Sequence, residues 1–177
     1  MKKLATFLFA MCIMSSMLFA QDISEVKAKI KGMNDSFSEM MINNDHQGMM
    51  MYYTEDCISL PSYQPMLRGI DAVKKSAEMQ EQSGMKTTAF SLTTTDLWET
   101  GDYYIEIGTY TITMELPQMK MPWSDNGKYI NVWQRFDDGS LKLKADIWNS
   151  DLNPWMEMQK FQEGEHEHQG EMEKGEG

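Results

Sequence analysis

The chain has 177 residues, with 16 Lys or Arg against 27 Asp or Glu, so its net charge is −11 at neutral pH. Such acidity disfavours nucleic acid and anionic membrane surfaces as partners. The length and the 41% share of hydrophobic residues fit a single globular domain.

The first twenty residues have the pattern of a secretory signal peptide. Lys2 and Lys3 precede an apolar stretch from Leu4 to Phe19, and Ala20 is a small residue at a suitable cleavage point. The stretch is too short for a stable membrane span. We therefore expect an exported bacterial protein, secreted or periplasmic after cleavage near Ala20, with no membrane span.

Three helices are predicted in the first half of the mature chain. Apolar residues recur at steps of three and four from Ile23 to Met41, which indicates one amphipathic helix. Asn43-Asn44-Asp45 ends this helix and caps the next. The other two helices span residues 46–53 and 70–83, with a short strand at residues 56–60 between them.

The second half of the chain changes to strand periodicity. Four strands are predicted, at residues 86–98, 103–116, 128–136 and 141–149. Turn residues separate the first two strands and the last two, and residues 117–126 are predicted to form a loop. Helices followed by a run of strands indicate an α+β fold.

The end of the chain has a different composition. Residues 157–177 are mostly Glu, Gly, His and Lys, which predicts a disordered acidic tail and leaves residues 21–156 as the domain. Cys57 is the one cysteine after cleavage, so no internal disulfide is expected. We expect Cys57 to be a buried thiol.

The order of these motifs resembles the nuclear transport factor 2-like (NTF2-like) superfamily, closest to its SnoaL-like and DUF4440-type branches, often labelled ketosteroid-isomerase-like. The matching motifs, within residues 22–154, are Phe37 with Asn44-Asp45, Tyr53-Thr-Glu-Asp56, Arg68-Gly69-Ile70, Asp102, Gly108-Thr-Tyr110, Gly127-Lys128-Tyr129, Trp133-Gln-Arg135, Asp138-Gly139 and Asp146-Ile-Trp148-Asn149. The resemblance implies a cone-shaped α+β fold with three N-terminal helices packed on a curved, mainly antiparallel sheet. It also implies a pocket for a small ligand, and a homodimer formed through the sheet. Members range from isomerases and dehydratases to binding domains, so the fold does not fix an activity.

The isomerase chemistry of this family needs a carboxylate base, and a tyrosine with a neutral carboxylic acid to hold the enolate oxygen. An alignment by motif places Phe37 at the tyrosine, Pro61 near the base and Val132 near the acid. All three roles lack a suitable side chain, so steroid isomerase activity is not expected.

Asp146 is the candidate catalytic residue. Period-two alternation places it on the same sheet face as Trp148. If that face lines the cone, burial would raise the pKa of Asp146 toward the range of proton transfer. The alternative is a carboxylate on the outer face, exposed or paired with Arg135. Lys142 and Lys144 share the parity of Asp146, so the sequence favours this alternative.

Aromatic residues supply the candidate ligand-binding side chains. The candidates are Tyr53, Trp98, Tyr110, Trp133, Trp148 and the neighbouring Asn149. Aromatic residues also dominate cores and interfaces, which is the favoured alternative for this set. Asp56 and Arg68 are expected to form an ion pair that holds the fold rather than a site.

Methionine is unusually frequent, with 19 in the chain. Three clusters lie after the signal sequence, at residues 49–51, 119–121 and 156–158. Thioethers are soft ligands suited to Cu(I), but they are also adaptable core filler, which is the favoured explanation. The loop from Met119 to Trp123 is a candidate lid. His166 and His168 in the tail cannot form a closed metal site alone.

The sequence therefore predicts an exported domain that binds a small apolar or amphipathic molecule, with no cofactor, no metal and no recognisable catalytic set. One alternative is an isomerase or lyase that uses Asp146 as acid or base. A second alternative is a Met-rich periplasmic copper-binding protein.

Overall fold

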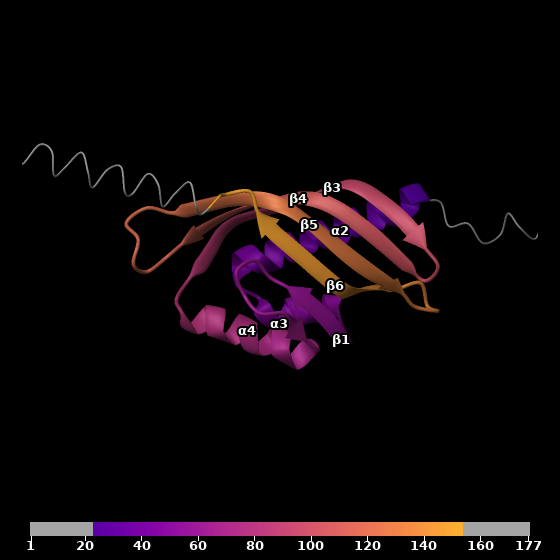
Figure 1. Ribbon diagram of the computed structural model, residues 1–177, viewed down its shortest axis with the longest axis horizontal. Helices are drawn as coiled ribbons and strands as arrows, with labels where there is room; N and C mark the ends of the chain where they lie inside the picture. Colours follow the sequence, from indigo (N-terminus) through magenta and orange to yellow (C-terminus); the bar gives the residue numbers. More distant parts are fainter. Residues whose placement is uncertain (1–22, 154–177) are drawn as a thin grey trace, which may run out of the picture.

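The computed structural model describes residues 23–153 (Figure 1). The predicted signal peptide and acidic tail, the 156–158 methionine cluster, and both tail histidines lie outside these residues. The elements in chain order are α2 (Ile23–Asn43), α3 (His46–Met49), a 3-10 helix η1 (Met50–Tyr52), β1 (Tyr53–Leu60), β2 (Leu67–Arg68), α4 (Ile70–Gln82), β3 (Lys86–Thr100), β4 (Tyr103–Glu115), β5 (Trp123–Arg135) and β6 (Leu141–Ser150).

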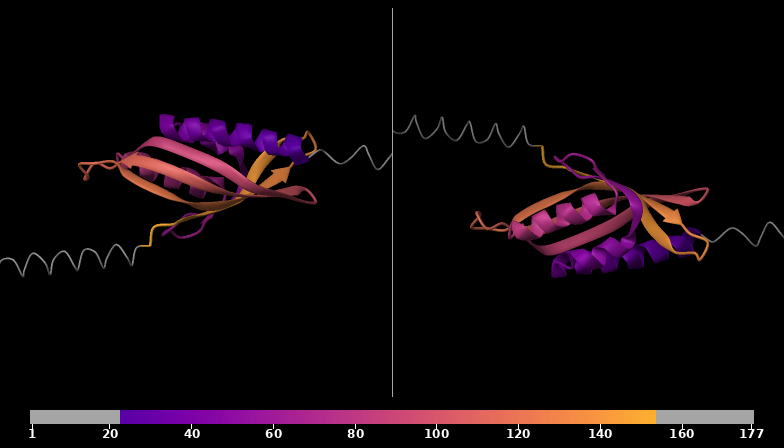
Figure 2. Two further views of the ribbon diagram at one scale, coloured as in Figure 1. Left: turned by 90° about the horizontal axis from the view of Figure 1, so that it is seen from above. Right: turned by 90° about the horizontal axis from the view of Figure 1, so that it is seen from below.

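The strands form one open, curved sheet in the order β2-β1-β6-β5-β4-β3. All neighbouring pairs are antiparallel except β1 and β6, which are parallel. The long helix α2 runs across one face of this sheet, and α4 lies on the same side near β1 and β2 (Figure 2). We call the face toward α2 the inner face and the other the outer face.

A hydrophobic core joins α2 to one end of the inner face. Its buried members are Val26, Ile30, Tyr52, Tyr53, Cys57, Val73, Tyr104, Trp133, Leu141 and Leu143. Val26 and Ile30 belong to the stripe that predicted α2, and the burial of Cys57 is confirmed. We call this the core end of the sheet, and the end with residues 116–122 the loop end.

The α+β class and the order of helices and strands agree with the sequence prediction. Asp45 caps α3 as expected, since its Oδ1 accepts a hydrogen bond of 2.8 Å from the Gly48 amide. The helices are not grouped at the N-terminus, because β1 and β2 come before α4. None of the helices within residues 23–153 is long and apolar enough to cross a membrane.

Two predicted boundaries are wrong. The helix predicted for residues 46–53 is shorter, because Tyr53 already begins β1. Residues 123–126 belong to β5 rather than to a loop. Asn126-Gly127 has turn-like composition, but Gly127 is needed for space: an added Cβ would lie 2.1 Å from the Asn149 carbonyl oxygen and 2.6 Å from Tyr110.

Candidate functional site

The inner face of the sheet is unusually polar at mid-length. Buried polar residues there include Glu106 on β4, Asp125 and Asn131 on β5, and Asp146 on β6. Alternation along each strand turns these side chains inward. They form three groups, one around Glu106, one around Asp146 and one around Asp125, which lies nearer the loop end.

Glu106 is fully buried, and its carboxylate accepts five hydrogen bonds. The five donors come from α2, β3 and β5: Asn34 Nδ2 at 2.7 Å, Thr94 Oγ1 at 2.6 Å and Tyr129 OH at 2.7 Å reach Oε1, while Asn131 Nδ2 at 3.2 Å and Trp133 Nε1 at 2.8 Å reach Oε2. A buried carboxylate is tolerated only when it is solvated by such donors. Because these donors already use both oxygens, we assign Glu106 a structural role, tying α2 to the sheet.

The sequence analysis did not identify Glu106. Two signals pointed to it. Asn34 occupies a position of the apolar stripe of α2, four residues after Ile30, and is itself buried. Tyr104 and Gly108 flank Glu106 on the same strand face, whereas Ile105 and Ile107 occupy the opposite face. A polar residue at a buried helix position predicts a polar partner on the facing sheet.

Asp146 lies on the inner face, which overturns the favoured prediction of an outer carboxylate. Its exposed fraction is 9%. The parity argument failed because β6 carries a β-bulge: Val132 pairs with Ala145, but Trp133 pairs with Leu143, so Lys144 is an extra residue. The bulge reverses the alternation, and Asp146 therefore points inward, as Leu143 does.

The surroundings of Asp146 leave its carboxylate incompletely paired. Tyr53 donates a hydrogen bond of 3.4 Å to Oδ2, and Ser59 is its neighbour in the β1–β6 register. Oδ1 is buried and has no hydrogen-bond partner among the residues that the structure describes. Burial raises the pKa of Asp146 to about 6, although hydrogen bonds from Ser59 and Tyr53 act in the opposite direction. Asp146 can therefore exchange a proton close to neutral pH.

Asn131 lies beside both buried acids. Its backbone is opposite Asp146 in the β5–β6 register, and its side-chain amide donates a hydrogen bond to Glu106. The inner face thus holds a fully paired carboxylate beside one that still has a free acceptor atom.

A third polar group lies nearer the loop end. Asp125 accepts hydrogen bonds from Tyr110 OH at 3.0 Å and from Ser150 Oγ at 2.7 Å. The indole of Trp148 packs edge-on against Tyr110, with ring centroids 6.2 Å apart. Burial and the neighbouring Asp125 carboxylate raise the pKa of Tyr110 above its usual value. Trp148 is 36% exposed, so this aromatic pair lies between the interior and solvent.

The predicted ligand-binding residues separate into two sets. Tyr53, Tyr110 and Trp133 are buried on the inner face, where Trp133 donates a hydrogen bond to Glu106, and Trp148 packs against Tyr110 at the margin of this face. Trp98 is 54% exposed and pairs with Ile105 near the end of β3, while Asn149 is exposed on β6. The structure therefore does not bring Trp98 or Asn149 to the inner group, and ligand binding by any of these residues stays a prediction.

The remaining ionic predictions have different partners from those expected. Arg135 contacts Glu99 at 3.0 Å and Asp102 at 3.8 Å, not Asp146. Asp56 pairs with Lys144, not Arg68.

Phe37, at the position of the family's tyrosine, packs against the rings of Tyr52 and Phe90.

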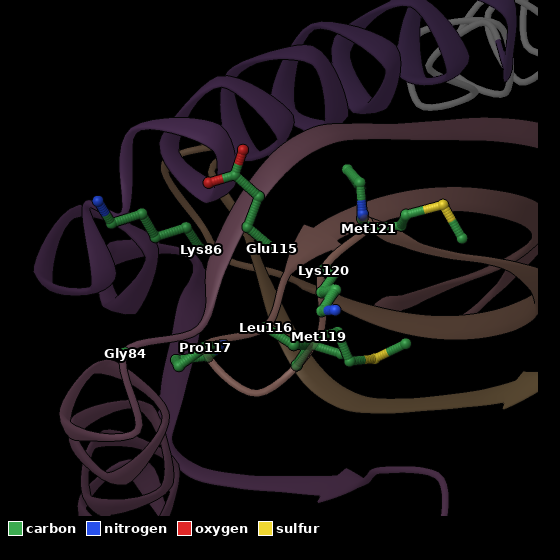
Figure 3. A pocket seen from close by; sticks show the side chains of 9 residues that line it. Gly84, Lys86, Glu115, Leu116, Pro117, Met119, Lys120 and Met121 are labelled. Carbon is green, nitrogen blue, oxygen red and sulfur yellow. The ribbon is translucent and has the colours of Figure 1, made fainter.

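A surface pocket of about 370 Å³ lies at the loop end (Figure 3). Its walls come from the start of β3, the end of β4 and the loop between β4 and β5: Gly84, Lys86, Glu115, Leu116, Pro117, Met119, Lys120, Met121 and Pro122. This is the loop predicted to act as a lid. Within residues 23–153, no group of three His, Cys, Asp or Glu side chains is arranged to hold a metal ion.

This curved sheet, with a long helix across an inner face that carries polar groups, is the NTF2-like fold, as the sequence motifs predicted. Among solved structures it is similar to a ketosteroid isomerase-like protein from Erwinia carotovora atroseptica, with 10% identity, a TM-score of 0.64, and coverage of 76% of this chain and 100% of that chain.

Two further structures show the same likeness. ActVI-ORFA from Streptomyces coelicolor has 16% identity, a TM-score of 0.61, and coverage of 72% of this chain and 98% of that chain. A putative scytalone dehydratase from Novosphingobium aromaticivorans also has 16% identity and a TM-score of 0.61, with coverage of 74% and 88%. No family model and no curated protein sequence matches the chain. The TM-scores establish a shared fold, but sequence identities this low give no information about activity.

Proposed function

We propose that the domain binds a small amphipathic organic molecule on the inner face of its sheet, with Asp146 as the polar anchor. The observation that carries this proposal is the buried, unpaired Oδ1 of Asp146. Leaving such an acceptor without a donor costs about 1–3 kcal/mol or more. A ligand that supplies a donor removes this cost, which gives the site both affinity and orientation.

The charges nearby indicate the chemical class of the ligand. Glu106, Asp125 and Asp146 are buried acids, whereas none of the Lys or Arg side chains within residues 23–153 is buried. An anionic ligand would meet uncompensated negative charge. A neutral hydroxyl or an ammonium group suits Asp146, with the apolar part of the molecule beside Tyr110 and Trp148.

The test begins with native mass spectrometry of the protein purified from its own source, which reports any retained molecule. Binding of three probes with one naphthalene skeleton is then measured by ligand-observed NMR: an alcohol, an amine and a carboxylate. We expect the alcohol or the amine to bind, and Asp146→Asn to weaken binding. Asp71→Asn, at a fully solvated position on α4, is the matched control. Absence of a retained molecule together with no binding of any probe would refute the proposal.

A second candidate function is proton transfer in an isomerase or lyase reaction. It is favoured by the pKa of about 6 at Asp146 and by the Tyr53 hydroxyl beside the carboxylate. Solvent deuterium incorporation next to the carbonyl of a cyclic enone probe measures this activity. Asp146→Asn should abolish incorporation and retain enone binding, whereas unchanged incorporation would exclude Asp146 as the base.

We also propose that the protein is exported by its N-terminal sequence and forms a homodimer through the outer face. Three isoleucines, Ile107, Ile130 and Ile147, are neighbours in the registers of β4, β5 and β6 on that face. None of them is fully buried, and Ile130 is 40% exposed. A continuous apolar row of this kind is typical of a protein interface.

A further inference from the structure

A pair of aromatic rings lies between two buried acids on the inner face. Tyr110 and Trp148 pack at an interplanar angle of 85°, with ring centroids 6.2 Å apart. Asp146 precedes Trp148 by two residues, so both side chains lie on the same face of β6. Ser150 follows on that face and donates a hydrogen bond of 2.7 Å to Asp125. The rings therefore have a carboxyl side chain on either side.

Tyr63 adds a third ring to this group. The segment after β1 continues beside the end of β6, where Ser62 Oγ donates a hydrogen bond of 2.7 Å to the Trp148 carbonyl. Burial and the Asp125 carboxylate are the main causes of the raised pKa of Tyr110, and Tyr63 adds to them, so its hydroxyl lies within electrostatic range of Tyr110. Tyr63 is 76% exposed, and its φ of 59° is unusual for a large side chain. Its ring is therefore accessible to a ligand at the edge of the inner face.

The negative charge beside these rings has no cationic partner in the described chain. Asp125 is 8% exposed, and its hydrogen bonds come from neutral donors, which are the Tyr110 hydroxyl, the Ser150 hydroxyl and the Asn126 amide. Within residues 23–153, no Lys or Arg forms an ion pair with Asp125 or Asp146. A cation against the rings would be attracted by both carboxylates and by the negative ring faces.

The hydrogen bonds of Asp125 indicate which kind of cation fits. Its Oδ1 accepts two of them and its Oδ2 the third, so little acceptor capacity remains. A primary ammonium would bring three N–H donors to this place and leave most of them unpaired. A quaternary ammonium has no N–H group and presents methyl groups to the rings, which is the form of cation that aromatic cages recognise.

We propose that Tyr63, Tyr110 and Trp148 bind the quaternary ammonium group of a small organic cation, whose hydroxyl group donates to Oδ1 of Asp146. The inference rests on the proposed function for the Asp146 anchor, and it adds the part of the ligand that lies at the loop end. Two rings near a right angle form adjoining walls around the methyl groups, and Asp125 supplies the opposite charge. The ligand class is a hydroxyalkyl ion with a trialkylammonium group.

Two probes of the same shape test the proposal by ligand-observed NMR on the full-length protein. One is choline, and the other is its neutral isostere, an alcohol in which a tert-butyl group replaces trimethylammonium. We expect choline to bind about tenfold more tightly, as for a partly desolvated cation–π contact. Equal affinities, or no binding of choline, would overturn the proposal.

Substitution of the rings locates the preference. Trp148→Leu should remove the preference for choline, and cooperative urea unfolding checks that the variant is folded. Trp98→Leu is the matched control, because Trp98 is 54% exposed outside the group. Tyr63→Phe should keep the preference, whereas Tyr63→Leu should reduce it. A preference that survives Trp148→Leu would place the cation elsewhere and refute the site.

Asp146→Asn separates this inference from the proposed function. It should weaken binding of the neutral alcohol, which reports the hydrogen bond to the carboxylate without a cation. If it does so and choline is not preferred, the Asp146 anchor stands and the quaternary ammonium site is refuted. If the alcohol is unaffected and choline is still preferred, the anchor is refuted and the aromatic site stands.

Discussion

Replacing Asp146 by Asn should increase the stability of the protein relative to the native chain as pH rises from about 4 to 6, the range in which this carboxyl ionises in the unfolded chain but not in the folded one. The pKa of Asp146 is raised from 3.8 to about 6 in the folded chain, chiefly by burial. The native state therefore holds a proton that the unfolded state releases above pH 3.8. As pH rises from about 4 to 6, this group lowers the stability of the folded protein.

The size of the effect can be calculated from the shift of roughly two pKa units. At 1.36 kcal/mol per unit, the native protein should lose about 3 kcal/mol over this window relative to Asp146→Asn. The hydrogen bonds of the new amide add an offset that does not depend on pH. Only the change in the difference between the two proteins with pH is therefore informative.

Urea unfolding of both proteins at several pH values between 3 and 7 provides the measurement. The free energy of unfolding of Asp146→Asn, minus that of the native chain, should increase between pH 4 and 6 and then level off. A difference that stays flat or decreases would refute the assignment of a buried, uncompensated carboxyl.

Asp56→Asn is a control of opposite sign. The exposed Asp56 carboxylate pairs with Lys144, which lowers its pKa, so its stabilising contribution is present at neutral pH and is lost as pH falls. The Asp56→Asn difference curve should therefore decrease as pH rises.

Three further predictions concern packing and assembly. Glu106→Gln places an amide NH2 group opposite two hydrogen-bond donors, so it should lower the free energy of unfolding, measured in urea, by about 4 kcal/mol. The exposed Glu55→Gln should have little effect. Equal stability of the two variants would contradict the structural role of Glu106. Gly108→Ala should destabilise by about 2–3 kcal/mol, since its Cβ would lie 2.4 Å from Tyr129 Cζ. Gly32→Ala has no atom within 4 Å and should instead stabilise α2 by up to about 1 kcal/mol, so similar effects at both glycines would argue against the packing. Ile130→Glu should convert a dimer into a monomer in light scattering, and the equally exposed Ile42→Glu should not; a native monomer would rule out the dimer.

The sequence predicted the order of elements well, because long helices and strands repeat their pattern many times. The stripe from Ile23 to Met41 defines α2 through about five turns, and an error at one position does not change the outcome. Short segments lack this redundancy. The stretch after His46 contains a single helical turn, a 3-10 turn and a strand within eight residues, which periodicity cannot separate.

The site was harder to predict, because it depends on single-residue events. The extra residue Lys144 reverses the face of Asp146, and no local feature of the sequence distinguishes a bulge from regular alternation. The Glu106 group depends on contacts between residues 72 and 27 positions apart, such as those with Asn34 and Trp133. Such pairing is set by the tertiary fold, so the strand pattern alone did not reveal it.

The five donors around Glu106 also have a consequence for how this protein can diverge. A substitution there must be accompanied by changes in α2, β3 and β5 together, since each contributes a donor that would otherwise be left unpaired. Positions near the loop end, such as Trp148, have fewer shared partners and can change one at a time. Variants selected for a new ligand should therefore carry their substitutions near the loop end, while the residues around Glu106 stay the same.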